Sequence, residues 1–253
     1  MALTASTPKA LTSKAALITG GSRGIGAAIA CRLAAEGADV AFTYHSSPGR
    51  AAEVVDAITA AGAKALALQL DSAAPDAARR AVDAVLEAFG RLDILVNNAG
   101  VFPNGPLDQV SAADIDQAIN LHIRAPFLFS QAAATAMGEG GRIITIGSNL
   151  ADRTPFSGVT LYSTTKAAVG ALARGLARDL GPRGITANVV QPGNTDTEMN
   201  PADSPEAVAD LPNIPLGRFA RAGEIAAAVA YLAGPDAQYV NGTTLTVDGG
   251  YNA

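Results

Sequence analysis

Short apolar segments alternate with amphipathic segments along almost the whole chain. Ala15-Ala16-Leu17-Ile18 is typical of a buried strand, and Ile25, Ile29 and Leu33 then recur every fourth residue, which predicts a helix before Gly37. The same alternation predicts strands at 40–43, 65–70, 94–96, 142–146, 186–190 and 243–247, and helices at 51–61, 75–89, from Ser111, 161–180 and 224–232. Short apolar strands that alternate with helices call for a parallel sheet covered on both faces. The pattern therefore predicts an α/β fold with a doubly wound (Rossmann) seven-stranded parallel sheet.

No internal repeat and no low-complexity linker divides the 253 residues. We therefore expect a single Rossmann-type domain over residues 14–253, preceded by a polar N-terminal tail at 1–13. Residues 194–215 contain prolines and apolar side chains without a clear periodicity. Because long irregular segments often cover a binding site, we expect a substrate lid there.

The composition limits the class of partner. The net charge is −5, from 18 basic and 23 acidic side chains, which leaves no basic footprint for nucleic acid or for an anionic membrane surface. No run approaches the ~20 apolar residues of a membrane span, and the N-terminus lacks the apolar core of a secretory signal, so we expect a cytoplasmic protein. The single cysteine, Cys31, and the two histidines, His45 and His122, leave little material for a disulfide or a metal site. We therefore expect a small-molecule substrate and no metal.

A glycine-rich turn joins the first expected strand to the first expected helix. Glycines at 20, 24 and 26 allow the backbone to turn tightly and to approach a phosphate at the helix N-terminus, although an ordinary strand-to-helix turn is an alternative. A nucleoside-triphosphate P-loop is excluded, because no Gly-Lys-Ser/Thr follows. Gly20-Gly21-Ser22-Arg23-Gly24 also matches the nucleophile elbow of hydrolases, but that mechanism needs a late histidine and none follows His122. The turn therefore indicates dinucleotide binding.

Tyr162 and Lys166 stand four residues apart near the start of the helix predicted at 161–180, so they share one face. A nearby ammonium favours the phenolate, so we expect Lys166 to lower the pKa of Tyr162 toward the range in which the phenol can exchange a proton. An isolated pair of this kind is more often an ordinary surface pair on an amphipathic helix. Ser163-Thr164-Thr165-Lys166 also matches the Ser-x-x-Lys of penicillin-binding enzymes, but their Ser-Asp-Asn and Lys-Thr-Gly companions do not occur.

Together these motifs resemble the short-chain dehydrogenase/reductase family over nearly the whole chain, from Ala15 to Tyr251. The matching motifs are Thr19-Gly20-x-x-x-Gly24-x-Gly26, Asn97-Asn98-Ala99-Gly100, Asn120, Ser148, Tyr162-x-x-x-Lys166 and Pro192-Gly193. The glycine spacing is similar to that of the short oxidoreductase branch, which contains the bacterial 3-oxoacyl-carrier-protein reductases. The resemblance implies the fold predicted above, a nicotinamide cofactor and a homotetramer or homodimer.

The resemblance implies a catalytic set of Asn120, Ser148, Tyr162 and Lys166. Tyr162 would protonate the carbonyl oxygen as hydride arrives from the nicotinamide, and Ser148 would hydrogen-bond the same oxygen. Lys166 would bind the nicotinamide ribose hydroxyls, and Asn120 would hold a water that continues the proton relay. The reaction implied is the reversible reduction of a ketone or aldehyde to an alcohol.

The cofactor contacts that the resemblance implies come from the ends of several strands. They are Gly20, Ser22, Arg23, Gly24, Ile25, Gly26, Tyr44, His45, Ser46, Asp71, Ser72, Asn97, Ala99, Gly100, Tyr162, Lys166, Pro192, Gly193, Thr195 and Thr197. Asn97 is expected beside the adenosine ribose, Asp71 and Ser72 beside the adenine, and the two threonines near the carboxamide and phosphates. Asn120, Asp71 and the threonines have a second interpretation as structural caps or turn residues.

The end of the second strand indicates which nicotinamide cofactor binds. NAD-preferring relatives carry an aspartate there for the adenosine ribose hydroxyls, whereas this chain has Tyr44, followed by Ser46 and Ser47. Arg23 stands inside the glycine turn. Hydroxyl and guanidinium groups accommodate a 2′-phosphate that a carboxylate would repel, so we expect NADP(H).

Two alternatives to reduction of a free carbonyl compound stay open. One is a 3-oxoacyl group on a carrier protein or coenzyme A, but Met137-Gly138-Glu139-Gly140-Gly141, before the fifth strand, lacks the basic residues that would dock an acidic carrier. The other is a non-catalytic nucleotide or dinucleotide sensor, because a fold alone does not prove turnover. The complete set of four catalytic residues favours an enzyme.

Overall fold

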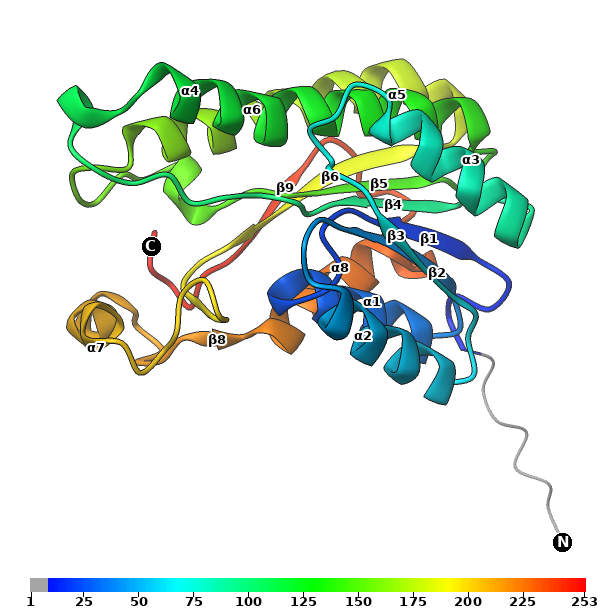
Figure 1. Ribbon diagram of the computed structural model, residues 1–253, viewed down its shortest axis with the longest axis horizontal. Helices are drawn as coiled ribbons and strands as arrows, with labels where there is room; N and C mark the ends of the chain where they lie inside the picture. The colour runs from blue at the N-terminus through cyan, green and yellow to red at the C-terminus, as the bar shows by residue number, and fades with distance from the viewer. Residues whose placement is uncertain (1–8) are drawn as a thin grey trace, which may run out of the picture.

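The computed structural model describes residues 9–253, and residues 1–8 of the expected tail lie outside them. At its centre is a seven-stranded sheet in the order β3-β2-β1-β4-β5-β6-β9, with every neighbouring pair parallel (Figure 1). The order changes direction between β1 and β4, which confirms the predicted doubly wound fold. The strands are β1 (Ala15–Ile18), β2 (Asp39–Tyr44), β3 (Ala65–Gln69), β4 (Ile94–Asn97), β5 (Arg142–Ile146), β6 (Thr186–Pro192) and β9 (Thr244–Val247).

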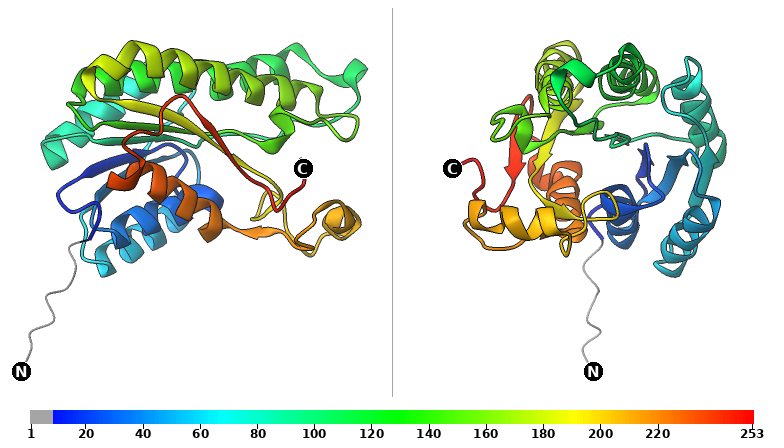
Figure 2. Two further views of the ribbon diagram at one scale, coloured as in Figure 1. Left: turned by 180° about the vertical axis from the view of Figure 1, so that it is seen from behind. Right: turned by 60° about the vertical axis from the view of Figure 1, so that its left-hand side comes forward.

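Helices cover both faces of the sheet (Figures 1 and 2). One layer contains α1 (Gly24–Ala35), α2 (Pro48–Ala60) and α8 (Ala222–Ala233), and the other contains α3 (Ala77–Phe89), α4 (Ala112–Ile119), α5 (Ala125–Ala136) and α6 (Thr160–Leu180). The two layers bury separate apolar clusters, one around Phe42 and Ile29 and the other around Phe129 and Leu95. Strands that are covered on both sides are mostly apolar, which is why short apolar runs mark them in the sequence, although buried polar residues such as Thr145 and Asn188 also occur in them.

Local signals explain where several elements begin and end. α2 begins at Pro48, ahead of the predicted start at 51, because proline suits the first turn of a helix, where its missing N–H costs nothing. α4 has the expected capping box, in which Ser111 and Asp114 each bond the other's backbone. The turn before β1 buries Leu11, so this part of the expected polar tail packs on the domain. Within the described residues, no helix is long and apolar enough to cross a membrane.

The segment expected to be a lid has structure of its own. β7 (Thr195–Asp196) pairs in parallel with β8 (Ala220–Arg221), and the short helix α7 (Pro205–Asp210) lies between them in the chain. α7 lies beyond the ends of the strands, in the same region as the C-terminus (Figure 2). The helical stretch expected from Ser111 consists of α4, the π-helical turn η2 (Asn120–Arg124) and α5, which follow one another without a break.

Candidate active site

A cleft of about 1130 Å³ opens at the carboxyl ends of the strands. Its lining includes Gly20, Tyr44 and Asp71 from the ends of the first three strands, and Ser148 and Pro192 from β5 and β6. Ligands of doubly wound folds bind in this place, because strand ends and helix N-termini converge there. The cleft is therefore the candidate site.

The glycine turn forms a closely packed wall of the cleft. A Cβ on Gly26 would lie 2.2 Å from the Gly20 carbonyl oxygen and 2.5 Å from Asn98 Nδ2, so only glycine fits at this position. Asn98 holds the turn in place, because its amide donates to the carbonyls of Thr19 and Gly20 at 3.0 and 2.9 Å. No side chain caps the N-terminus of α1, so its first N–H groups are available to an anion. The turn fits a dinucleotide pyrophosphate.

The far end of the cleft carries the groups that distinguish the two nicotinamide cofactors. Tyr44 ends β2, and His45 and Ser46 follow it in the lining, with no carboxylate at this position. Arg23 is exposed and forms no ion pair within residues 9–253. A guanidinium and hydroxyl groups that line the same cleft fit a 2′-phosphate. Ser72 Oγ lies 3.3 Å from Thr43 Oγ1, so this hydroxyl also supports the floor of the cleft.

Ser148, Tyr162 and Lys166 meet at the other end of the cleft. Ser148 follows β5, and Tyr162 and Lys166 lie in the first two turns of α6. The Lys166 ammonium donates to the Ile146 carbonyl at 2.9 Å and lies 5.9 Å from the centroid of the Tyr162 ring. Asn120 ends α4 and opens the π-helical turn, and it does not line the cleft itself. The structure thus brings together three of the four predicted catalytic residues.

Burial dominates the electrostatics of the pair on α6. It raises the pKa of Tyr162, and the hydrogen bond with Ser148 lowers that pKa by a smaller amount. Burial also lowers the pKa of Lys166 to about 8. The expected net lowering of the Tyr162 pKa is therefore not found, because removal of the phenol from water is the largest influence on this pKa and raises it, and Lys166 is not among the groups that shift it. The phenol keeps its proton at neutral pH.

Three exposed apolar side chains with no role assigned from the sequence line the cleft. They are Phe102, Phe156 and Met199, with exposed fractions of 36%, 46% and 56%. Phe102 packs edge-on to the Tyr162 ring, with 4.7 Å between centroids and 77° between planes. Large apolar side chains left exposed in a cleft favour an organic ligand with its own apolar surface.

Almost all of the predicted cofactor residues line the cleft, and Asn97 is the exception. Asn97 is 4% exposed, and its side chain donates to Ser130 Oγ on α5 at 3.2 Å and to Thr145 Oγ1 on β5 at 3.4 Å. The expected place beside the adenosine ribose is therefore not where Asn97 lies, and Asn98 occupies the lining instead. The residues found in the lining as predicted are Gly20, Ser22, Arg23, Gly24, Ile25, Gly26, Tyr44, His45, Ser46, Asp71, Ser72, Ala99, Gly100, Tyr162, Lys166, Pro192, Gly193, Thr195 and Thr197.

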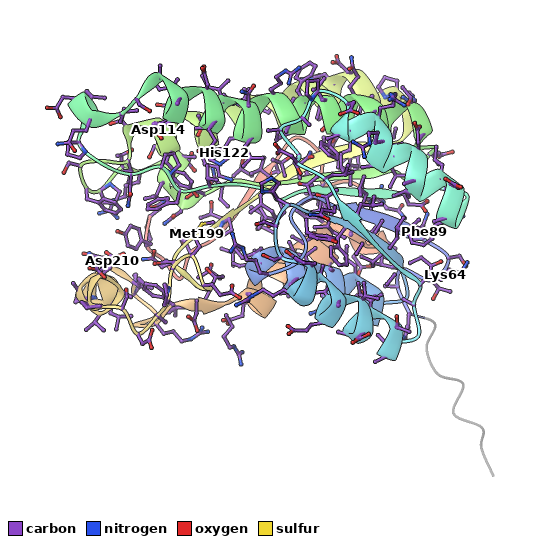
Figure 3. The ribbon with its side chains drawn as sticks, viewed as in Figure 1. Lys64, Phe89, Asp114, His122, Met199 and Asp210 are labelled. Atoms are coloured by element: carbon purple, nitrogen blue, oxygen red, sulfur yellow. The ribbon has the colours of Figure 1, made fainter. Side chains whose placement is uncertain are left out.

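Polar contacts join three distant segments in the lining of the cleft. The Tyr251 hydroxyl donates to Asp210 Oδ1 on α7 at 3.1 Å, and Arg153, after β5, donates to the Tyr251 carbonyl. The arginine also lies over the Tyr251 ring, 5.7 Å from its centroid. Burial and the Asp210 charge raise the pKa of Tyr251 to about 12, so it stays a donor. Figure 3 shows Asp210 and Met199 in the segment that faces the helices around His122.

Comparisons with known proteins agree with this geometry. Residues 20–252 match the family model described as enoyl-(acyl carrier protein) reductase. Among solved structures, the chain is similar to a short-chain dehydrogenase from Burkholderia cenocepacia J2315 in complex with NADP, with 56% identity, a TM-score of 0.95, and 96% of this chain and 100% of that chain covered. It is also similar to a blue fluorescent protein from a metagenomic library in complex with NADPH, with 51% identity, a TM-score of 0.94 and the same coverage.

One relative is named for nucleotide binding rather than for a dehydrogenase or reductase activity. The chain is 46% identical over 244 residues to the cyclic-di-GMP-binding biofilm dispersal mediator protein of Escherichia coli (strain K12), which covers 96% of this chain and 99% of that protein.

Proposed function

The chain belongs to the short-chain dehydrogenase/reductase family, and on this premise we propose that it reduces a ketone or aldehyde to an alcohol with NADPH, reversibly. The observation that carries the proposal is the convergence of Ser148, Tyr162 and Lys166 on the cleft that also contains the glycine turn. Chemistry on a carbonyl needs a proton donor, a hydrogen bond to the oxygen and a bound hydride source in one place. Structures similar to this chain contain NADP or NADPH.

The residues that would hold the cofactor form a continuous path along the cleft. Arg23 and Ser46 would bind the 2′-phosphate, and the N-terminus of α1 would bind the pyrophosphate. Lys166 would donate to the nicotinamide ribose hydroxyls with the N–H groups that the Ile146 carbonyl leaves free. When bound, NADPH supplies the hydride.

Tyr162 is the proposed general acid. Because burial raises its pKa, the phenol carries its proton at neutral pH and can donate it to the carbonyl oxygen as negative charge develops there. Ser148 would donate a hydrogen bond to the same oxygen. Asn120, at the π-helical turn behind α6, would hold the water that returns a proton toward Lys166.

We propose a free carbonyl compound as the substrate. The apolar side chains of Phe102, Phe156 and Met199 favour a substrate with an apolar part beside its carbonyl. The name of the matching family model supports the alternative, an acyl group on a carrier protein. The segment before β5, with Glu139 and no basic residue, would repel an acidic carrier.

A binding protein without turnover is the second candidate. The Escherichia coli relative supports it, because that protein is named for binding cyclic di-GMP. The completeness of Asn120, Ser148, Tyr162 and Lys166 favours turnover, since a sensor needs no proton donor beside its nucleotide.

The experiment that separates these candidates measures NADPH oxidation by absorbance against a panel of aryl, alkyl and 3-oxoacyl carbonyl compounds. We expect turnover with at least one free carbonyl compound, and a loss of more than about a thousandfold in Tyr162→Phe with NADPH affinity retained. If no panel member is reduced while cyclic di-GMP or NADPH binds tightly, the binding function is correct instead.

We also propose that the protein is a homotetramer. Ile119 on α4 and Phe127 on α5 are apolar and exposed, with exposed fractions of 41% and 56%, on the layer that contains α6. A second copy could bury such a face. Light scattering that gives the mass of a monomer would contradict this assembly.

A further inference from the structure

His122 is buried at the junction of the elements that carry the proposed catalytic groups. It lies on the π-helical turn η2, between α4 and α5, and its side chain is 2% exposed. Figure 3 shows it within the layer of helices on the side of the sheet that carries α4 and α6. A π-helical turn adds a residue to the helix and redirects the side chains after it, often beside a functional site. His122 does not line the cleft, and the proton transfer proposed above does not use it.

The hydrogen bonds of His122 have a fixed direction. The Val101 nitrogen lies 3.0 Å from His122 Nε2, and because an amide N–H can only donate, Nε2 is the acceptor and the ring proton is on Nδ1. Nδ1 donates to the Thr165 hydroxyl at 2.9 Å. That hydroxyl donates its own proton to the Tyr162 carbonyl oxygen at 2.9 Å. One chain of bonds therefore runs from the loop after β4 to the backbone of the proposed general acid.

Packing brings His122 against the same groups. Its ring is edge-on to the Tyr162 ring, with 5.8 Å between centroids and 84° between planes. Gly100 lies close to both groups, since a Cβ at this position would lie 3.2 Å from His122 Nε2 and 3.6 Å from Lys166 Nζ. The imidazole and the ammonium thus both lie beside the backbone at Gly100.

The imidazole is neutral in this setting. Burial and the charge of Lys166 lower the pKa of His122 to about 3. A proton on Nε2 would remove the acceptor for the Val101 N–H and place a second positive charge near Lys166. A neutral imidazole is one of the few side chains that offers a donor and an acceptor on opposite sides of a rigid ring.

We propose that His122 is a positioning residue, which holds the 99–101 loop and the first two turns of α6 in one arrangement so that Tyr162 and Lys166 meet the cofactor and substrate together. This inference rests on the proposed reductase function. His122 acts through Thr165 and the backbone, and it touches neither ligand. A leucine could fill the space, but it would leave the Val101 N–H without its acceptor and the Thr165 hydroxyl without the donor to its oxygen.

The kinetic test compares four variants of the full chain at saturating NADPH. In His122→Leu we expect kcat to fall about 10- to 100-fold, because small misplacements of catalytic groups have effects of this size, while the Kd for NADPH changes less than about threefold. His122→Gln, which keeps an acceptor for Val101, recovers part of the loss. Thr165→Val breaks the next bond and reproduces the loss, whereas Thr164→Val, at the exposed neighbouring position, retains the wild-type rate.

A double variant separates positioning from general destabilisation. If His122 and Thr165 act in one chain of bonds, His122→Leu/Thr165→Val loses no more than the worse single variant. Losses in kcat that multiply would contradict the inference, as would a folded His122→Leu protein with unchanged kcat. An active wild type whose His122→Leu variant keeps its rate refutes the positioning role alone. A wild type that reduces no carbonyl compound refutes the proposed function and the positioning role with it.

The tautomer of His122 gives a readout that does not depend on turnover. The chain has two histidines, so the ring signals of the ¹⁵N-histidine-labelled protein are assigned by their absence in His122→Leu. We expect the Nδ1–H tautomer at pH 7. The Nε2–H tautomer would overturn the inference even in an active enzyme, because the chain of bonds to Tyr162 would then not exist.

Discussion

Lys166 is a buried cation, and its charge should reduce the stability of the protein without ligand. Its side chain is 6% exposed, and its ammonium donates to the Ile146 carbonyl at 2.9 Å. Burial lowers its pKa from 10.5 to about 8, and no carboxylate contributes to that shift. A cation that is buried without a counter-ion is disfavoured relative to the same group in water. We therefore predict that the native state is more stable once Lys166 is neutral.

The magnitude and the sign of the Lys166 contribution to the free energy of unfolding follow from its pKa in the unfolded chain and its pKa in the native state. A fall from 10.5 to about 8 corresponds to an upper limit of about 3 to 4 kcal/mol, at ~1.36 kcal/mol per pKa unit. Between these values the unfolded chain binds the proton more tightly than the native state, so this group makes the free energy of unfolding rise with pH. Below pH 8 both states are protonated and the contribution is constant. Local relaxation reduces the expected effect to about 1–3 kcal/mol.

Lys166→Met tests this prediction, because it removes the charge and keeps a long side chain. Free energies of unfolding in urea are measured for both proteins at pH 7 and pH 10.5, at one protein concentration. We expect the variant to lose about 1–3 kcal/mol of stability relative to wild type between the two pH values. Lys166→Met also loses the hydrogen bond to the Ile146 carbonyl. This loss affects the variant equally at pH 7 and pH 10.5, so it cancels when the two stability differences are compared. A matched variant at Lys64, whose side chain is 71% exposed, should show no such change. A stability difference for Lys166→Met that is independent of pH would refute the reasoning.

Three further predictions concern the cofactor and the proton. Gly26→Ala should weaken NADPH binding at least about tenfold in a fluorescence titration, because the new Cβ would lie 2.2 Å from a backbone oxygen. Gly49→Ala is the control and should bind NADPH normally, because a Cβ at position 49 meets no atom within 4 Å. Arg23→Ala should raise the KM for NADPH about tenfold and leave that for NADH nearly unchanged, and an equal effect on both would contradict a role at the 2′-phosphate. Alcohol oxidation should accelerate as pH rises above neutrality, because it needs the Tyr162 phenolate and burial raises the pKa of this phenol. The measurement is the initial rate of NADP⁺ reduction, and an optimum below pH 7 would be inconsistent with Tyr162 as the group that exchanges the proton.

Much of the fold could be predicted because parallel strands are buried on both faces. The run Arg142–Ile146 is short and buried at every position, with three isoleucines among its five residues, and Ser148 enters the cleft two positions after its end, so strand position and site position follow from one signal. The capping box at Ser111 is equally local. The structure of the segment expected to be a lid was less predictable, since α7 is only six residues long and packs through Tyr251, far away in the chain.

The errors in the site come from side-chain direction and burial, which a linear pattern does not contain. Asn97 and Asn98 are adjacent, and strand geometry turns the first toward Ser130 and the second toward the glycine turn. The spacing of Tyr162 and Lys166 places them on one face, as predicted, but the pKa of the phenol depends on how deeply the first turns of α6 are buried. The sequence gives the four-residue spacing of Tyr162 and Lys166, but it does not show how completely folding removes water from the phenol, and this removal sets the direction of the pKa shift.

Transfer of hydride to a carbonyl carbon is the central claim, and isotope transfer tests it most directly. NADPH that carries deuterium at the transferable C4 position is incubated with the protein and the best carbonyl compound of the panel, and the product is analysed by mass spectrometry. We predict an alcohol with one deuterium on the carbinol carbon, formed by the wild type and not by Tyr162→Phe, which still binds NADPH. Tight NADPH binding by the wild type with no deuterium in any product would contradict the account.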